Sequence, residues 1–384
     1  MGFLSHRSTL SFLFLGIMFF VGVDLNLIAP LIPAIDTSFR ISPAKGGFLV
    51  TAFALGYIFA SPLAGWAADR WGRRQVVLTG LTGLFLAELA SALAPDFFAL
   101  LAARTAGGLF AGAVSPEIYA WIGDQYHGEA RTRSMALASF GLSLSTVLGV
   151  PLGMGIGQIA GWRVALGLLA GFFAVSETLL LHVKAPVPPR SARVPPPWSP
   201  SRQWRPLWIS FCAFGAVGAI YTFLPTELTR YGLGPQALLA VLMGYGGLSA
   251  LGNLIYARKA IHGGILPVLR RALWSETVII LILTVIALKV SLPGLILSSL
   301  GFGFIQAYIP LIKSWASQVP SRMRARSLAW NNTAMYSGLL SGSAAASLVY
   351  RHGQFWPIAT IGLGFILLAT VGLPALRKNG TFFQ

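Results

Sequence analysis

Seven charged side chains lie inside long stretches of apolar sequence, and these are the residues of the chain that are best suited to carry out chemistry. Five are carboxylates and two are cations: Asp24, Glu88, Glu117, Glu177, Glu276, Arg104 and Lys313. A charge surrounded by apolar residues is costly, so such residues normally face a wet cavity or a partner of opposite charge. The chemistry open to them is ion pairing, proton uptake and release, and binding of a polar ligand.

Among these residues, Asp24 and Arg104 are the best candidates for a functional pair of opposite charges. Asp24 lies deepest in the first apolar stretch, with Asn26 close to it, and Arg104 lies near the middle of the fourth. A carboxyl group away from water can take up a proton near neutral pH, and a nearby guanidinium opposes that uptake. A movement of one group relative to the other would therefore exchange a proton. The alternative is a fixed ion pair that only holds two helices together.

The composition predicts a membrane protein. The 384 residues are 55% hydrophobic and 10% charged, whereas a soluble domain carries about 25% charged residues. This excludes an ordinary cytosolic enzyme and a disordered binding protein. The single Cys212 excludes a disulfide framework within the chain, and the five histidines show no ligand spacing. We therefore expect no metal site, no cofactor and no enzymatic activity, and the sequence shows neither a phosphate-binding G-x-x-x-x-G-K-[ST] motif nor a nucleophile paired with a base.

Twelve apolar stretches are long enough to cross the hydrocarbon layer as helices, which takes about 20 residues each. The Pro-rich basic segment 184–205 cannot be a membrane helix, and it separates the first six stretches from the last six. We expect an all-α integral membrane fold with two pseudo-symmetric six-helix bundles, 1–183 and 206–384, joined by the linker 184–205. The predicted spans are 10–33, 46–68, 75–94, 97–121, 134–160, 163–183, 206–228, 236–257, 267–288, 290–312, 327–349 and 354–376.

The formal charge of +17 is distributed along the chain as an orientation signal. Twenty of the 28 Lys and Arg residues fall on the side of the membrane that holds both termini and the linker, six on the other side and two within spans. Positive residues accumulate in cytoplasmic loops. We expect a multi-pass protein of the inner (plasma) membrane with both termini in the cytoplasm, and no nucleic-acid partner.

The loop after the second span carries a specific motif, Gly65-Trp66-Ala67-Ala68-Asp69-Arg70-Trp71-Gly72-Arg73-Arg74. It resembles the signature of the major facilitator superfamily between its second and third helices, G-x-x-x-D-R-x-G-R-R/K. The resemblance implies a cytoplasmic latch between the halves, helped by an acid at the end of the fourth helix, for which Asp124 is the match. The latch residues are Gly65, Asp69, Arg70, Gly72, Arg73, Arg74 and Asp124. The alternative is an ordinary basic loop with an incidental aspartate.

Two further motifs resemble the drug and sugar efflux branch of that superfamily. Arg104, followed by Gly107 and Gly108, matches the fourth-helix arginine that the family ties to proton coupling in exporters. The fifth span carries small residues at every fourth position, which lie on one stripe of a helix and allow close helix packing. Val150 separates the Gly and Pro that are adjacent in the common antiporter motif. The motif residues here are Gly149, Pro151, Gly153 and Gly157.

The roles of the other acids within the spans are predicted from their positions along the helices. Glu117 is a candidate for the cavity, but it lies about 220° round the helix from Arg104 and nearly in line with Asp124, which favours the latch. Glu177 and Glu276 lie near cytoplasmic ends, where we expect them to reach water. Glu88 lies in the third span, which usually faces outward in the family, so we expect it to be peripheral.

The second half offers neutral hydrogen-bonding groups as possible substrate contacts. Single Tyr residues are more often anchors at the membrane interface, which is the alternative for each tyrosine. The loop around Arg258 lacks the acid and glycines of its first-half counterpart, so we expect an asymmetric latch. The candidate contacts are Tyr221, Gln306, Tyr308, Asn331, Asn332 and Tyr336.

The resemblance implies a secondary transporter, and we expect a monomeric, proton-coupled exporter of a small amphipathic molecule that works by alternating access. Its partners would be that molecule, protons and membrane lipid. Two alternatives remain: a proton-independent uniporter or importer in which Asp24 and Arg104 bind a small metabolite, and a membrane scaffold or sensor without flux.

Overall fold

The structure, a computed structural model, describes residues 2–126, 128–183, 204–289, 291–318, 321–350 and 354–373. At a few of these positions, Asp69 among them, only the backbone is described. The predicted linker lies outside the described residues, apart from Trp204 and Arg205, which begin a helix.

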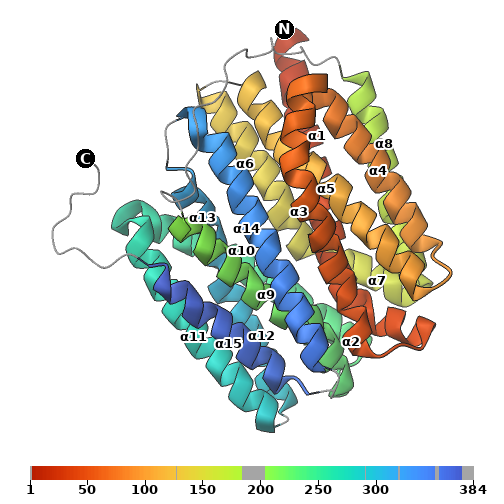
Figure 1. Ribbon diagram of the computed structural model, residues 1–384, viewed down its shortest axis with the longest axis vertical. Helices are drawn as coiled ribbons and strands as arrows, with labels where there is room; N and C mark the ends of the chain where they lie inside the picture. The colour runs from red at the N-terminus through yellow and green to blue at the C-terminus, as the bar shows by residue number, and fades with distance from the viewer. Residues whose placement is uncertain are drawn as a thin grey trace.

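The first half contains six membrane-length segments (Figure 1). A one-turn helix, α2 (Pro43–Gly46), connects the first two. The fifth segment is a continuous rod in which α6 and α7 flank one π-helical turn, η1. The segments are α1 (Gly2–Phe39), α3 (Phe48–Trp71), α4 (Arg73–Ala92), α5 (Phe97–Gln125), α6–η1–α7 (Gly128–Leu144, Ser145–Gly149, Val150–Ala160) and α8 (Trp162–His182).

The second half repeats this organisation (Figure 1). Its fourth segment is interrupted by a short 3₁₀ turn, η3, between α12 and α13. The segments are α9 (Trp204–Arg230), α10 (Pro235–Gly263), α11 (Ile265–Lys289), α12–η3–α13 (Leu292–Ile305, Gln306–Tyr308, Ile309–Ala316), α14 (Ser321–Val349) and α15 (Trp356–Val371).

These segments confirm the predicted all-helical membrane fold, with one segment for each of the twelve predicted spans. Within the described parts of the chain, ten are long and apolar enough to cross a membrane. Of the other two, α15 is apolar but shorter, and α14 is 29 residues long but rich in Ser and Arg. We call the end where α8 finishes and α9 begins the linker end, and the end where α1 and α9 finish the far end.

Glycines with positive φ make two of the tight connections in the first half. Gly72 (φ 97°) separates α3 from α4, and Gly161 (φ 93°) separates α7 from α8. A residue with a Cβ rarely adopts such a backbone, so these turns depend on glycine. Asp96 starts α5 by accepting a hydrogen bond on Oδ1 from the Ala99 amide at 2.8 Å. These short connections force neighbouring helices to run antiparallel.

The same helix pairings occur in both halves. The first segment packs on the fifth (α1 on α6, α9 on α14), and the second packs on the fourth (α3 on α5, α10 on α12). Glycines allow the backbones to touch at these crossings: a Cβ on Gly141 would meet the Leu15 carbonyl oxygen, and one on Gly338 would meet the Phe211 carbonyl oxygen. Small residues at helix crossings are typical of membrane bundles.

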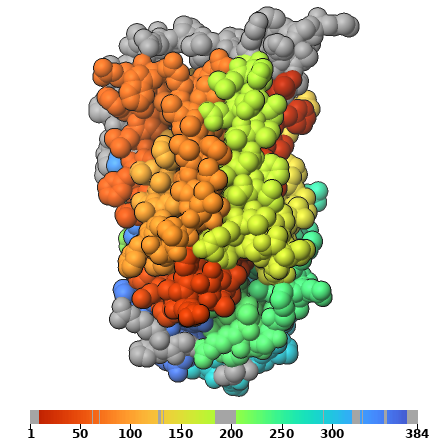
Figure 2. All heavy atoms as spheres, turned by 90° about the vertical axis from the view of Figure 1, so that its right-hand side faces the viewer, coloured from red at the N-terminus to blue at the C-terminus, as the bar shows by residue number. Residues whose placement is uncertain are grey.

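One side of the first half is an apolar wall formed by α4 and α8, which lie next to each other (Figure 2). Leu86, Leu93, Leu168, Phe172 and Leu179 project from it and are 46–71% exposed. Exposed apolar side chains along two membrane-length helices form a surface suited to contact with acyl chains.

The two halves meet between the middle of the bundle and the far end. In Figure 1, α14 runs beside α3, and these two helices make the most extensive contact between the halves. Thr51 and Ser343 share a hydrogen bond of 2.8 Å between their hydroxyls. The rings of Tyr57 and Tyr336 stack with centroids 3.4 Å apart. Near the far end, Gln158 donates to the Pro235 carbonyl at 3.1 Å.

Candidate functional site

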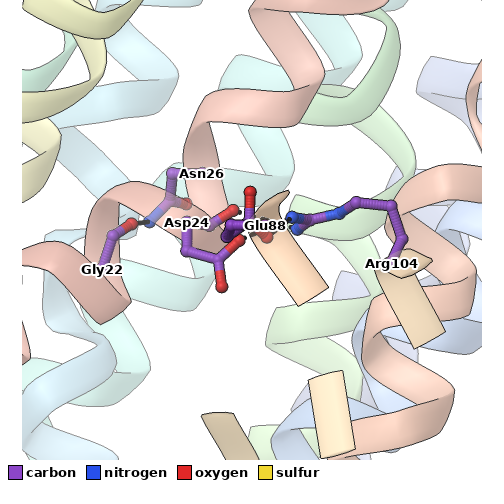
Figure 3. A network of polar contacts seen from close by, with 5 residues as sticks. All are labelled: Gly22, Asp24, Asn26, Glu88 and Arg104. Carbon is purple, nitrogen blue, oxygen red and sulfur yellow. Dashed lines mark hydrogen bonds and ion pairs between the residues drawn. The ribbon is translucent and has the colours of Figure 1, made fainter. Parts of the chain in front are cut away.

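Arg104, Asp24 and Glu88 form a buried ion cluster at the centre of the first half (Figure 3). The Nη1 atom of Arg104 lies 2.6 Å from Asp24 Oδ1 and 2.7 Å from Glu88 Oε1. Its Nη2 donates to the Asp24 carbonyl oxygen at 3.1 Å. Three helices therefore meet at one guanidinium: α1, α4 and α5. We call these three residues the central triad.

The central triad is almost completely shielded from the surroundings. The three side chains are 0–1% exposed, and no described residue supplies a hydrogen-bond partner for Asp24 Oδ2, Glu88 Oε2 or Arg104 Nε. Two carboxylates and one guanidinium carry a net charge of minus one, and one bound proton makes the cluster neutral. A net charge is costly at low dielectric, so a fully ionised cluster is disfavoured in such a buried site.

Two glycines and an aromatic ring border this cluster. A Cβ on Gly107 would lie 3.5 Å from Glu88 Oε1, an ordinary van der Waals contact, so this position lies directly beside the carboxylate. A Cβ on Gly108 would collide with the Phe53 backbone, so α3 can approach α5 only because this residue is glycine. The Phe53 ring covers the guanidinium at 4.7 Å, a cation–π contact that also excludes water.

The other two candidate cavity residues, Asn26 and Glu117, bind other groups. Asn26 stays local, because its Nδ2 donates to the Gly22 carbonyl at 2.8 Å (Figure 3). Glu117 lies on the other side of α5, where it binds Arg73. Glu88, which we expected to be peripheral, is the second acid of the triad. A sequence does not show how an apolar helix is rotated about its axis, and the only signal for Glu88 was a carboxylate within an apolar span.

The motif between α3 and α4 forms an ion cluster near the linker end. Arg73 Nε is hydrogen-bonded to Asp124, and its Nη1 lies 2.7 Å from Glu117 Oε2. Arg74 donates to the carbonyls of Leu180 and Leu181 at 3.2 and 3.0 Å, which ties α4 to the end of α8. All of these bonds lie within the first half.

Other latch residues take different positions. Arg70 is exposed, with its guanidinium 5.8 Å from the Trp66 ring centroid. Gly72 makes the tight turn described above, and Gly65 lies in α3, half-buried. The side chain of Asp69 lies outside the described part of the structure.

The small-residue stripe of the fifth segment packs along α1. A Cβ on Gly149 would meet Val23 and Phe19, one on Gly153 would meet Leu27, and one on Gly157 would meet Leu31. The contacted residues follow one another along α1 at steps of four, so the two helices remain in close contact over several turns.

A π-helical turn, Ser145–Gly149, ends two residues before the buried Pro151. Proline has no N–H to continue the α-helical ladder, and a single wide turn is a common local adjustment. This turn contacts both halves, because a Cβ on Gly22 of α1 would meet the Ser145 side chain and one on Gly246 of α10 would meet the Thr146 carbonyl. The motif therefore lies at the interface between the halves.

In the second half, two of the candidate substrate contacts are occupied by internal hydrogen bonds. Gln306 donates to the Tyr245 hydroxyl, and Tyr308 donates to Glu276 Oε2 at 2.5 Å. Tyr221 is buried, with its ring 5.3 Å from that of Tyr245. The polar groups expected to face a ligand therefore form a polar core between α9, α10, α11 and η3.

The candidates on α14 divide between the interior and the interface. Asn331 is fully buried and accepts a hydrogen bond from the Ser210 hydroxyl at 2.7 Å. Asn332 is half-buried. Tyr336 crosses to the first half and stacks on Tyr57 of α3. Tyr336 is thus a candidate contact at the interface between the halves.

The sequence matches a family model of known proteins over most of its length. Residues 14–343 match the model described as the Major Facilitator Superfamily. The Bacillus subtilis protein named "Uncharacterized MFS-type transporter YceJ" is 29% identical over 392 aligned positions, covering 96% of each chain. The "Quinolone resistance protein NorA" of Staphylococcus aureus is 26% identical over 170 positions, 43% of each chain.

Solved structures share the same fold. The D-xylose–proton symporter superposes with a TM-score of 0.78 at 17% identity, covering 96% of this chain and 98% of the symporter. The human organic anion transporter MFSD10 gives a TM-score of 0.76 at 20% identity, covering 96% of this chain and 99% of the other. At these identities the likeness establishes the fold alone.

Proposed function

We propose that this chain, which belongs to the Major Facilitator Superfamily and is a multi-pass membrane protein, is a proton-coupled exporter of a small amphipathic molecule. The observation that carries the proposal is the central triad, in which two buried carboxyl groups share one guanidinium. The two halves would rock about their interface and expose the triad to one side of the membrane at a time. The family and its solved relatives are transporters, which supports transport as the general activity.

The charge balance of the triad supports proton coupling. With one proton bound, the cluster is neutral and stable in its dry site; without it, the cluster carries an uncompensated charge. Substrate or water reaching the triad would compensate that charge and release the proton. Binding of proton and substrate would then exclude each other, which is the requirement for an antiporter.

The charge distribution supports an orientation. The linker end carries most of the Lys and Arg residues, so we assign it to the cytoplasm, with both termini, in the inner (plasma) membrane. The contacts between halves described above lie from the middle to the far end, while the Arg73 and Arg74 bonds stay within the first half. In this assignment the structure represents a state closed toward the outside.

The direction of transport is supported by the stripe on the fifth segment and by one relative's name. Gly149, Gly153 and Gly157 pack tightly on α1 beside the triad, which would prevent a proton leak between these helices. NorA is named for quinolone resistance. The available energy is adequate, because one charge crossing 100 mV yields about 2.3 kcal/mol, or roughly 50-fold accumulation at about 1.4 kcal/mol per tenfold change.

The test begins with a thermal-shift screen of amphipathic compounds on the purified protein, because a hit defines a usable probe. The hit is then followed in proteoliposomes under an imposed proton gradient. We expect transport against the compound's own gradient, in the direction opposite to proton flow. Flux that is indifferent to the gradient would instead establish a uniporter, and transport in the direction of proton flow an importer. Absence of flux for every hit would favour a scaffold or sensor.

A further inference from the structure

Another buried carboxyl group, that of Glu276, lies in the second half of the molecule. Glu276, in the middle of α11, is 0% exposed. Its Oε2 accepts the hydroxyl hydrogen of Tyr308 at 2.5 Å, and its Oε1 has no hydrogen-bond partner in the part of the chain that the structure describes. We expected this residue to reach water near a helix end, but the structure encloses it completely.

No cation neutralises Glu276 among the ion pairs of the described residues. The titratable groups around it are neutral: Tyr245 and Tyr256 on α10, Tyr308 on η3, and Cys212 on α9 beside Tyr308. On the other elements packed against α11, Lys313 of α13 is half-buried and makes none of these ion pairs. Neither α12 nor α15 contains a titratable residue.

Glu276 lies on the same segment of its half as Glu88 does. Glu88 lies on the third segment and binds Arg104 on the fourth. Glu276 lies on the third segment of the second half and binds Tyr308 on the fourth. Each half therefore holds a carboxyl group between its third and fourth segments, with a guanidinium as partner in the first half and a phenol in the second. In the second half, the negative charge of the Glu276 carboxylate has to be neutralised by something other than a cation.

We propose that Glu276 is a second proton-binding site, in which the buried side chain is held as the neutral carboxylic acid in this conformation. A buried carboxylate without a counter-charge is strongly disfavoured, whereas the neutral acid avoids the cost of a buried charge and keeps its hydrogen bond with Tyr308. The hydrogen-bonded pair Gln306–Tyr245, next to Tyr221, continues the polar core from η3 toward α9, which packs on the first half. Any use of this proton in transport rests on the proton-coupled function proposed above, but its occupancy does not.

Infrared difference spectroscopy of the purified protein tests this site directly, because a protonated carboxyl group has its own C=O stretching band. We expect the spectrum of the wild type minus that of Glu276→Gln, at neutral pH, to contain such a band, and the band to shift in D2O. Glu177→Gln is the matched control: Glu177 is partly exposed and accepts the Thr82 hydroxyl at 2.5 Å, so its removal is expected to leave the acid band in place. Loss of carboxylate bands instead of the acid band in Glu276→Gln would overturn the proposal.

A second variant covers the case in which Glu276→Gln does not fold. Tyr308→Phe keeps the carboxyl group and removes its hydrogen bond, so we expect one acid band to remain and move to higher wavenumber. If no acid band moves, Glu276 is not the protonated group bound by Tyr308 and the proposal is wrong. These spectra are independent of any flux, so a failure of the transport proposal and a failure of this one are distinguishable.

Discussion

Replacing Arg104 by methionine is expected to be one of the most destabilising single substitutions in the first half. The change removes the two contacts of 2.6 and 2.7 Å to carboxylates, a third hydrogen bond to the Asp24 carbonyl, and the cation–π contact with Phe53. It leaves Asp24 and Glu88 buried together without a counter-charge. Breaking a buried ion pair in this way costs about 3–5 kcal/mol.

The sign of the pH dependence follows from the same charge balance. Without Arg104, both carboxyl groups have to be neutral to remain buried, so the folded Arg104→Met variant binds more protons than the unfolded chain. Its stability relative to the wild type should therefore improve as the pH falls and worsen as the pH rises. The combined variant Arg104→Met, Asp24→Asn, Glu88→Gln removes both acids and should recover part of the loss at neutral pH.

Thermal unfolding in detergent, followed by intrinsic tryptophan fluorescence, measures these differences. Arg258→Met is a suitable control, because Arg258 is exposed near the linker end of α10 and surface substitutions usually change stability by less than about 0.5 kcal/mol. The reasoning is refuted if Arg104→Met unfolds at the wild-type temperature, or if the combined variant is no more stable than the single one at neutral pH.

Two further predictions follow from the packing. Gly153→Leu should lower the unfolding temperature by the equivalent of about 1–3 kcal/mol, because a Cβ there would already lie 2.8 Å from the Leu27 side chain. The same change at Gly155, where nothing lies within 4 Å, should have little effect, and equal losses at both positions would contradict the α1 packing. Thr51→Cys with Ser343→Cys, in a Cys212→Ala background, should form a disulfide between the halves, because the two native hydroxyls are 2.8 Å apart. Oxidation should stop transport and reduction should restore it; free transport by the oxidised protein would contradict a rocking movement that separates these residues.

Most of the fold could be predicted from the sequence, because the hydrocarbon layer imposes a length and an apolar composition on every span. The motif between α3 and α4 and Asp124 were also singled out from the residues, but their role as a latch between the halves stays a prediction, since the bonds of Arg73 and Arg74 lie within the first half. The π-helical turn was not predicted. Pro151 indicated only a break in the helical ladder, and the kind of adjustment depends on the helices packed around it.

The errors concern the direction in which side chains point. Glu88 and Glu276 were judged from their distance to helix ends and from the usual exposure of the third span, but burial depends on how each helix is rotated against its neighbours. A helix that is apolar on all sides gives little information on that rotation. For the same reason Gln306 and Tyr308 were expected to face a ligand, whereas they form hydrogen bonds inside the second half.

The most direct test of the central triad compares two transport modes of the Asp24→Asn variant in proteoliposomes, with the compound identified by the thermal-shift screen. Exchange of labelled for unlabelled compound needs no net proton movement, while accumulation driven by a proton gradient does. We predict that Asp24→Asn loses the driven accumulation and that exchange continues. Driven accumulation at the wild-type level in Asp24→Asn would contradict the assignment of the coupling proton to the cluster of Asp24, Glu88 and Arg104.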